Sequence, residues 1–246
     1  MKAPSLCSRT RIDQAVKTAP RGSSSHCLLA PMHYEANYAY PLVVWLHSDG
    51  GDEKQLLRVM PHLSMRNYVA VGVRAGGSCQ GRRGYEWKQT GACIAGAEGR
   101  VQEAIAAAKA RYHVNSEHIF LAGHDAGGTM AYRLALRNPA KYAGALSAGG
   151  RFPLGQAPLA NLHSLRDLPL FLAYCRDSET YTSDDLCDEL PLFHAAALKV
   201  AIRQYPCGDE LTTQMLADMN AWMMERVTGV ASSSDETAAA SRGQWN

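Results

Sequence analysis

The sequence predicts an α/β fold class, with a mostly parallel central sheet, helices on both faces and no large lid. Short and almost wholly apolar runs recur along the chain, as expected of parallel strands that are buried on both faces. Segments with helical spacing of apolar residues separate these runs. Strands and helices that alternate in this way form a parallel sheet through right-handed crossovers, so we predict one domain over residues 26–228.

Apolar and β-branched runs predict the strands, in chain order 27–33, 42–46, 68–73, 118–122, 142–147, 169–174 and 200–205. Pro31 restricts the first strand to an edge or an end of the sheet, because proline cannot donate to a strand ladder. The segment 74–87 after the third strand is glycine-rich and too long for a tight connection. We interpret it as either a solvated surface loop or a pocket wall.

Helical periodicity predicts helices at 52–65, 96–112, 129–137, 184–198 and 210–227. Asp52 and Glu53 lie at the start of the first, where the helix dipole favours acids, and Pro61 is expected to kink or break that helix. Asn138 and Pro139 end the third helix. Residues 1–25 and 229–246 are polar and aperiodic, and we predict that they are disordered.

The composition argues against several classes of function. A formal net charge of +2, without a basic stripe, indicates neither a nucleic-acid-binding nor a membrane-surface protein. The N-terminal segment lacks the apolar core of a secretion signal, and no window approaches the roughly 20 apolar residues of a membrane span. Seven cysteines without a C-x-x-C pair favour reduced thiols in a cytoplasmic protein over a disulfide framework or a structural zinc site.

The main functional signal is a stretch that reads as strand, sharp turn and helix. The apolar run His118–Ala122 leads into the segment Gly123–Gly128, with the sequence Gly-His-Asp-Ala-Gly-Gly, and an Ala- and Leu-rich helical pattern follows at once. The spacing G-x-D-x-G lets a chain turn in a strained conformation and raises the central side chain above the edge of a sheet. The raised residue is Asp125.

Three segments together resemble the α/β-hydrolase superfamily: the elbow 123–128, the segment 41–51 with His47-Ser48-Asp49-Gly50-Gly51, and the segment 203–211. Their order and spacing are similar to those of the carboxylesterase/phospholipase group and of esterases like the polyhydroxybutyrate depolymerases, over roughly residues 26–228. Members of this group usually carry Ser where this chain has Asp125, and His where it has Asp209. The resemblance implies the fold and a hydrolase relationship, with the catalytic pair replaced.

The resemblance also assigns the other positions of the site. His47 and Ser48 fall where similar proteins have a His and a glycine run that supplies oxyanion N–H groups, and the N–H of Ala126 would be the second donor. The acid of the triad falls in the segment 175–178. We choose Asp177 for it, although a shift of one residue would place Ser178 there.

Three carboxylates are therefore expected to converge where one serine, one imidazole and one acid belong. Asp125 and Asp209 would share a proton, because nearby carboxylates raise each other's proton affinity. An anion fixed where an oxyanion must develop opposes serine-type ester hydrolysis. The side chain of His124 is expected to diverge from Asp125 at the turn, and we do not predict it to be a base.

Our leading hypothesis is a catalytically impaired relative of carboxylesterases that still binds a small acyl or other ester-like ligand. A rival hypothesis is an active hydrolase of altered chemistry. It would use Asp125 as nucleophile, as in the haloalkane dehalogenases and epoxide hydrolases that share the fold, or a metal held by the carboxylates. No spaced ligand motif supports a metal, and no cofactor is predicted. A third hypothesis, a scaffold protein, has no positive signal, and the oligomeric state stays open.

Overall fold

The computed structural model describes residues 25–79, 81, 83–160 and 162–230. The predicted disordered segments 1–25 and 229–246 lie almost entirely outside these residues. Within them, no helix combines the length and the apolar character needed to cross a membrane.

Seven strands form one sheet in the order β1-β3-β2-β6-β7-β8-β9, which confirms the predicted α/β class. The first strand pairs antiparallel with β3, at the edge of the sheet as predicted, and every other neighbouring pair is parallel. The strands are β1 (His26–Leu29), β2 (Tyr40–Leu46), β3 (Val69–Val73), β6 (Val114–His124), β7 (Gly144–Ala148), β8 (Pro169–Cys175) and β9 (Lys199–Tyr205).

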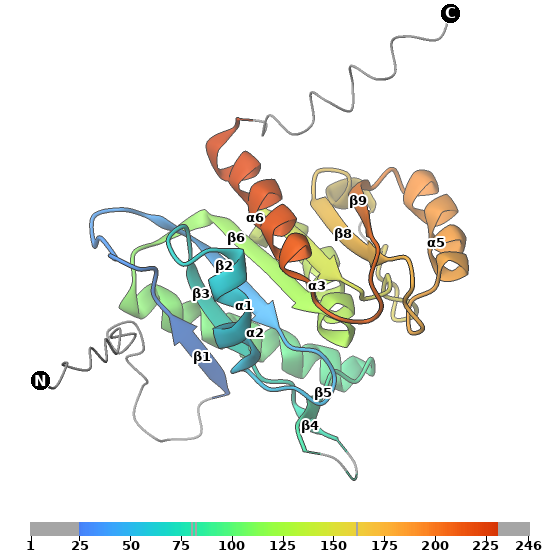
Figure 1. The fold of residues 1–246 in the computed structure, drawn as a ribbon, viewed down its shortest axis with the longest axis horizontal. Coiled ribbons are helices and arrows are strands. Elements are labelled where there is room, and N and C mark those ends of the chain that lie inside the picture. Colours follow the sequence, from blue (N-terminus) through green and yellow to red (C-terminus); the bar gives the residue numbers. More distant parts are fainter. Residues whose placement is uncertain (1–24, 80, 82, 161, 231–246) are drawn as a thin grey trace, which may run out of the picture.

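Helices cover both faces of this sheet (Figure 1). Residues of α1 and α6 form the core on one face, and residues of α2 and α3 form most of the core on the other. The helices are α1 (Gln55–Leu63), α2 (Gly91–Arg111), α3 (Ala126–Arg137), α4 (Leu162–Leu165), α5 (Ser183–Ala195) and α6 (Thr213–Thr228), with a 3₁₀ turn at Pro139–Lys141.

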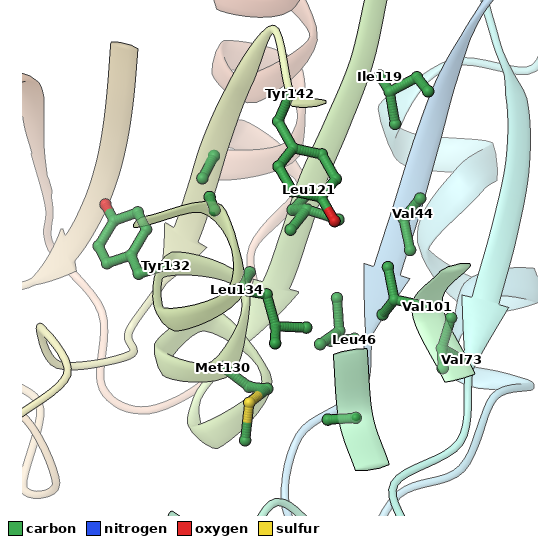
Figure 2. Packing of buried hydrophobic residues seen from close by; sticks show 14 of the residues in the cluster. Val44, Leu46, Val73, Val101, Ile119, Leu121, Met130, Tyr132, Leu134 and Tyr142 are labelled. Atoms are coloured by element: carbon green, nitrogen blue, oxygen red, sulfur yellow. The ribbon is translucent and has the colours of Figure 1, made fainter. Parts of the chain in front are cut away.

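The central strand β2 serves both cores, because successive side chains of a strand point to opposite faces. Leu42, Val44 and Leu46 lie in the core beneath α2 and α3, whereas Val43 and Trp45 lie in the core beneath α1 and α6. Figure 2 shows the first of these layers, with Val44 and Leu46 beside side chains of α2 and α3. This two-sided burial is the reason why the strand is apolar throughout.

Pro61 lies inside α1 and does not end it, so of the predicted kink or break the break does not occur. Proline removes one helical hydrogen bond. The helix nevertheless continues to Leu63, because its buried face, with Leu56 and Met60 fully covered, packs against the sheet and outweighs the lost bond.

Asp52 and Glu53 precede α1 and do not form its first turn, so the predicted dipole contact is absent. Glu53 instead accepts two hydrogen bonds of 2.6 Å from Arg74, at the end of β3. Burial of Glu53 raises its pKa, but the hydrogen bonds from Arg74 outweigh this and hold the pKa below its usual value. The acid at this position joins the end of β3 to the start of α1.

Helix α2 and strand β6 begin well before the residues that the periodicity predicts. Helix α2 begins at Gly91, because the Thr90 side chain accepts the N–H of Cys93 and caps it. Strand β6 begins at Val114, where polar residues hide the strand pattern. The segment 74–87 contains a short hairpin, β4 (Gly77–Ser78) paired with β5 (Tyr85–Glu86).

The parallel arrangement brings the functional segments together. The carboxyl ends of β2, β6, β8 and β9 open at the same edge of the sheet, where ligands of open α/β sheets bind. Residues 47–51, 176–180 and 206–210 lie in the loops that leave β2, β8 and β9, and residues 123–128 form the end of β6, the turn at Asp125 and the start of α3.

Candidate functional site

Asp125 lies in a strained turn between β6 and α3. Its φ is 53° and its ψ is −128°, a conformation that costs a residue with a side chain roughly 1–3 kcal/mol. The Asp125 N–H donates to the carbonyl of Ala148 at 2.9 Å, and its carbonyl accepts the N–H groups of Gly128 and Thr129. The surrounding backbone therefore holds residue 125 in the elbow conformation.

Close backbone packing explains the glycines on either side of Asp125. A Cβ atom at Gly123 would lie 2.4 Å from the carbonyl carbon of Gly127, and one at Gly127 would lie 2.3 Å from the carbonyl oxygen of Leu46. Both separations are well inside the contact distance of carbon atoms, which is about 3.5–4 Å. These glycines let β2, β6 and α3 approach closely, so the elbow has kept its shape around an acidic residue.

A backbone N–H in the loop after β2 is directed at the Asp125 carboxylate. The N–H of Asp49 donates to Oδ2 of Asp125 at 3.4 Å. Partial burial raises the pKa of the Asp49 carboxyl; the N–H of Trp87 acts against this, and the charge of Asp125 raises the pKa further. The charge of Asp125 therefore acts on the pKa of the Asp49 carboxyl group.

His47 is a structural histidine that shapes the loop after β2. Its side chain is fully buried, and its Nε2 accepts the N–H of Ala75 at 3.0 Å. Nδ1 therefore carries the proton and donates to the carbonyl of Ser48 at 2.7 Å. Burial lowers the pKa of His47, which keeps the ring neutral. The indole N–H of Trp87 donates to the His47 carbonyl at 2.8 Å and closes this frame.

Ser48 is not available as an oxyanion donor. Its N–H donates to Oε1 of Gln55 at 3.2 Å, and its hydroxyl accepts a hydrogen bond of 3.0 Å from Nε2 of the same glutamine. Gln55 also accepts the indole N–H of Trp45 at 2.8 Å. The oxyanion role that the resemblance assigned to Ser48 therefore does not fit the structure, and Gln55 is a loop-positioning residue that the sequence analysis missed.

Asp209 is held by two hydroxyl groups. Its Oδ1 accepts hydrogen bonds from Ser178 at 2.5 Å and from the Thr180 hydroxyl at 2.7 Å, and the Thr180 N–H adds a third at 3.3 Å. The bonds from Ser178 and then Thr180 lower the pKa of Asp209. Within the described residues no hydrogen bond joins the Asp125 and Asp209 carboxylates, so the structure gives the predicted shared proton no support.

Ser178, and not Asp177, meets Asp209. The Asp177 carboxylate is exposed and accepts two hydrogen bonds from Arg176, at 2.9 and 3.0 Å. The three carboxylates that were expected to converge are therefore separated by their partners. The described residues contain no group of three or more His, Cys, Asp or Glu side chains placed to bind a metal.

His124, which precedes Asp125 in the chain, forms a hydrogen bond with Asp209 and none with Asp125 within the described residues. The carbonyl of Asp209 is an acceptor, so Nε2 of His124 must be the protonated nitrogen that donates to it at 3.1 Å. Burial lowers the pKa of His124, and the charges of Asp125 and Asp209 only partly offset this. In the described part of the chain, no imidazole forms a hydrogen bond with Asp125.

A cavity of about 410 Å³ lies directly over the elbow. It is lined by Asp49, Trp87, Gln89, Asp125, Ala126, Thr129, Arg133, Gly149, Arg151, Phe152, Leu154 and Thr180. The Arg133 guanidinium is fixed by Gln89 and by the carbonyls of Leu154 and Gly155. Trp87, the last residue of the segment 74–87, lines the cavity, so this end of the segment forms part of the pocket wall.

The fold and the elbow agree with a comparison against protein families. The model of the phospholipase/carboxylesterase family matches residues 77–225, which is more than half of the 246-residue chain. The chain belongs to the phospholipase/carboxylesterase family. Its place in this family confirms the resemblance drawn from the three sequence segments. No curated protein sequence matches the chain.

Solved structures with this fold include a carboxylesterase and an acyl-protein thioesterase. Arabidopsis thaliana SOBER1 superposes with a TM-score of 0.66 at 16% identity, over 77% of this chain and 100% of that one. The Bacillus cereus carboxylesterase gives 0.65 at 18% identity, over 82% and 93%. The Zea mays acyl-protein thioesterase 2 gives 0.66 at 12% identity, over 82% and 98%. At these identities the likeness establishes the fold.

The structure places the predicted site residues at one edge of the sheet and adds several partners that sequence reasoning missed. Asp125, Ala126 and Asp209 lie in the predicted segments, and no hydrogen bond to the Ala126 N–H is formed within the described residues. Thr180 carried no signal, because it follows β8 by several residues of irregular chain. Gln55 carried none either, since a polar residue at the start of a helix is unremarkable.

Proposed function

We propose that this family member does not hydrolyse esters by the serine mechanism and that it binds a small acyl or other ester-like ligand over the elbow. The observation that carries the proposal is the hydrogen bond from the Asp49 N–H to the Asp125 carboxylate. We infer that this N–H lies where an ester's developing oxyanion would need a donor, and the Asp125 side chain engages it.

Electrostatic magnitudes favour the loss of ester hydrolysis. One oxyanion donor is worth about 2.7–4 kcal/mol of transition-state stabilisation. Two unit charges about 4 Å apart repel each other by about 4 kcal/mol at the effective dielectric constant of a protein surface. Replacing a neutral hydroxyl by the Asp125 carboxylate therefore both engages a donor and adds repulsion of comparable size.

The path of the proton gives independent support. A serine nucleophile needs an imidazole base that an acid orients. At the imidazole position this chain has Asp209, whose carboxylate accepts hydrogen bonds from Ser178 and Thr180. The neighbouring His124 directs Nε2 to the Asp209 carbonyl. Among the described residues, no imidazole is hydrogen-bonded to residue 125 to accept its proton.

The pocket supports a binding role. A volume of about 410 Å³ lies within the range of small-molecule sites. Its lining includes the apolar walls Trp87, Phe152 and Leu154 and the guanidinium of Arg151. Relatives of the same fold include proteins named as carboxylesterases and an acyl-protein thioesterase. An ester-like ligand is the class that both observations support.

The catalytic part of the proposal is tested with short-chain p-nitrophenyl esters and a fluorophosphonate probe. We expect no turnover and no labelling of the wild-type protein. The double substitution Asp125→Ser/Asp209→His restores a nucleophile and a base, and is expected to be labelled at position 125. Wild-type turnover that disappears in Asp125→Asn would contradict the proposal. If the double variant stays unlabelled, more than these two residues has been lost.

The binding part is tested separately with p-nitrophenyl butyrate as an unreacted ligand. Saturation-transfer NMR is expected to detect it on the wild-type protein and not on Thr129→Trp, in which a large ring fills the cavity. Circular dichroism verifies that the variant is folded. Equal transfer to both proteins would exclude this cavity as the binding site.

A second candidate function is an altered hydrolase in which Asp125 is the nucleophile. The observation that favours it is the strained elbow, which still presents the Asp125 carboxylate to the cavity. A carboxylate oxygen would attack a saturated carbon and expel a halide or open an epoxide, leaving an alkyl ester on Asp125. Incubation with short alkyl halides and epoxides, followed by peptide mass analysis, detects this ester. Its absence in wild type and Asp125→Asn alike would exclude this candidate.

A further inference from the structure

Two buried cysteines meet beneath the loops that hold Ser178 and Asp209. Cys175 is the last residue of β8, and Cys207 follows the end of β9 by two positions. Their Sγ atoms lie 3.1 Å apart. The backbones around them are joined as well, since the N–H of Asp177 donates to the Cys207 carbonyl at 3.0 Å and that of Arg176 donates to the Tyr205 carbonyl at 2.8 Å.

We propose that Cys175 and Cys207 are an oxidation site that closes reversibly to a disulfide. A disulfide bond is about 2.05 Å long, so the two sulfur atoms must approach each other by about 1 Å. Small rotations of the two side chains are sufficient for a movement of this size. The paired ends of β8 and β9 hold the backbones in place while this happens.

The oxidant is hydrogen peroxide or a small disulfide, and with peroxide the step balances as follows. The sulfur of Cys207 attacks one peroxide oxygen, the O–O bond breaks, and a sulfenic acid and one water form. The sulfur of Cys175 then attacks the sulfenic sulfur, and the S–O bond breaks to release a second water. Two thiols and one peroxide give one disulfide and two waters, and the thiol protons leave in the water.

The environments of the two thiols set the order of these steps. Cys207 is 8% exposed and Cys175 is 3% exposed, so the peroxide reaches Cys207 first. Burial and the neighbouring sulfur of Cys207 raise the pKa of the Cys175 thiol, which lowers its fraction of reactive thiolate. The pair is therefore expected to oxidise slowly and to respond to sustained oxidant.

The disulfide would fix the geometry of the site. Cys175 precedes Ser178 by three positions, and Cys207 precedes Asp209 by two. Closing the bond joins the loop that donates the Ser178 hydroxyl to the loop that carries its acceptor. The oxidised form is therefore expected to hold the Ser178–Asp209 contact more rigidly than the dithiol form.

The test uses the full chain, treated with hydrogen peroxide and then blocked with iodoacetamide under denaturing conditions. Peptide mass analysis is expected to find Cys175 and Cys207 cross-linked, with the mass of two hydrogen atoms lost, and dithiothreitol is expected to reverse this. The exposed Cys187 is the internal control, because it has no thiol neighbour in the described residues. Complete alkylation of Cys175 and Cys207 after conditions that oxidise Cys187 would overturn the proposal.

Matched variants sharpen the result. Cys207→Ser is expected to abolish the cross-link and leave Cys175 alkylatable, whereas Cys187→Ser is expected to form the cross-link at the wild-type rate. A cross-link between other cysteines in place of the Cys175–Cys207 cross-link would also overturn the proposal. The wild-type peptide map alone gives this answer even if a variant fails to fold.

Discussion

The Asp125 carboxylate accepts the Asp49 N–H, and the two side chains face the same cavity. The raised pKa of Asp49 is the measurable sign of this crowding, with desolvation as its largest cause. Because that pKa is higher in the folded than in the unfolded state, ionisation of Asp49 opposes folding. Its favourable contribution is complete at low pH and is lost as the pH rises through the folded pKa.

Asp49→Asn is therefore expected to stabilise the protein at pH 7 and to have little effect at pH 3. The gain stays below about 1 kcal/mol, since solvent at the exposed rim screens the charges. Thermal unfolding at the two pH values measures it. Asp188→Asn, at an exposed site on α5, is the control and should change neither midpoint. Destabilisation by Asp49→Asn at pH 7 would contradict this account.

Ser178 accounts for the largest part of the lowered pKa of Asp209. Ser178→Ala is expected to raise this pKa toward the ordinary value of about 4. The stability that the depressed pKa provides is present above the unfolded pKa and is lost as the pH falls through the folded one. NMR titration of the Asp209 carboxyl group measures the shift, and the exposed Ser183→Ala is the matched control. An unchanged titration would mean that Thr180 alone sets this pKa.

At the scale of secondary-structure elements, β2, β6 and α3 meet at glycines that exclude a side chain. Gly127→Ala would drive a methyl group into the carbonyl of Leu46, and is expected to destabilise the fold by at least about 2 kcal/mol. Gly99→Ala on α2 has open space around the added methyl group, and is expected to stabilise by about 0.5–1 kcal/mol. Urea unfolding of both variants checks the opposite signs. A neutral Gly127→Ala would mean that the elbow relaxes easily.

The strands that are buried on both faces could be predicted from the sequence, because their residues are almost all apolar. Apolar runs identified the inner strands, and the glycine spacing identified the elbow before α3. Helix α1 continues beyond Pro61, because the packing of its buried face outweighs the low helix propensity of proline. The choice between Asp177 and Ser178 could not be made from periodicity, since the loop after β8 has none. In the structure, Arg176 binds Asp177, and Ser178 forms the hydrogen bond with Asp209.

At the scale of the whole molecule, the site unites segments from distant parts of the chain, from residues 47–51 to residues 206–210. The parallel sheet alone brings them to one edge. Partners of single residues, such as Gln55 for Ser48 and Thr180 for Asp209, depend on this assembly. For that reason these partners could not be predicted from the sequence, whereas the family and the fold could.

The proposed disulfide belongs to this scale, because it restricts the unfolded chain. Cys175 and Cys207 are 32 positions apart, and closing a loop of that length is worth on the order of 3–4 kcal/mol. The oxidised protein is expected to unfold on the order of 10 °C higher than the reduced one. Calorimetry with and without dithiothreitol measures the difference, and the same comparison on Cys207→Ser should show none.

The left-handed backbone at residue 125 also makes this position an opportunity for protein engineering. Glycine adopts that conformation freely, so exchanging the aspartate for it would release stored strain while emptying the mouth of the cavity. A sturdier scaffold with a neutral entrance would be a natural starting point for building new binding specificities.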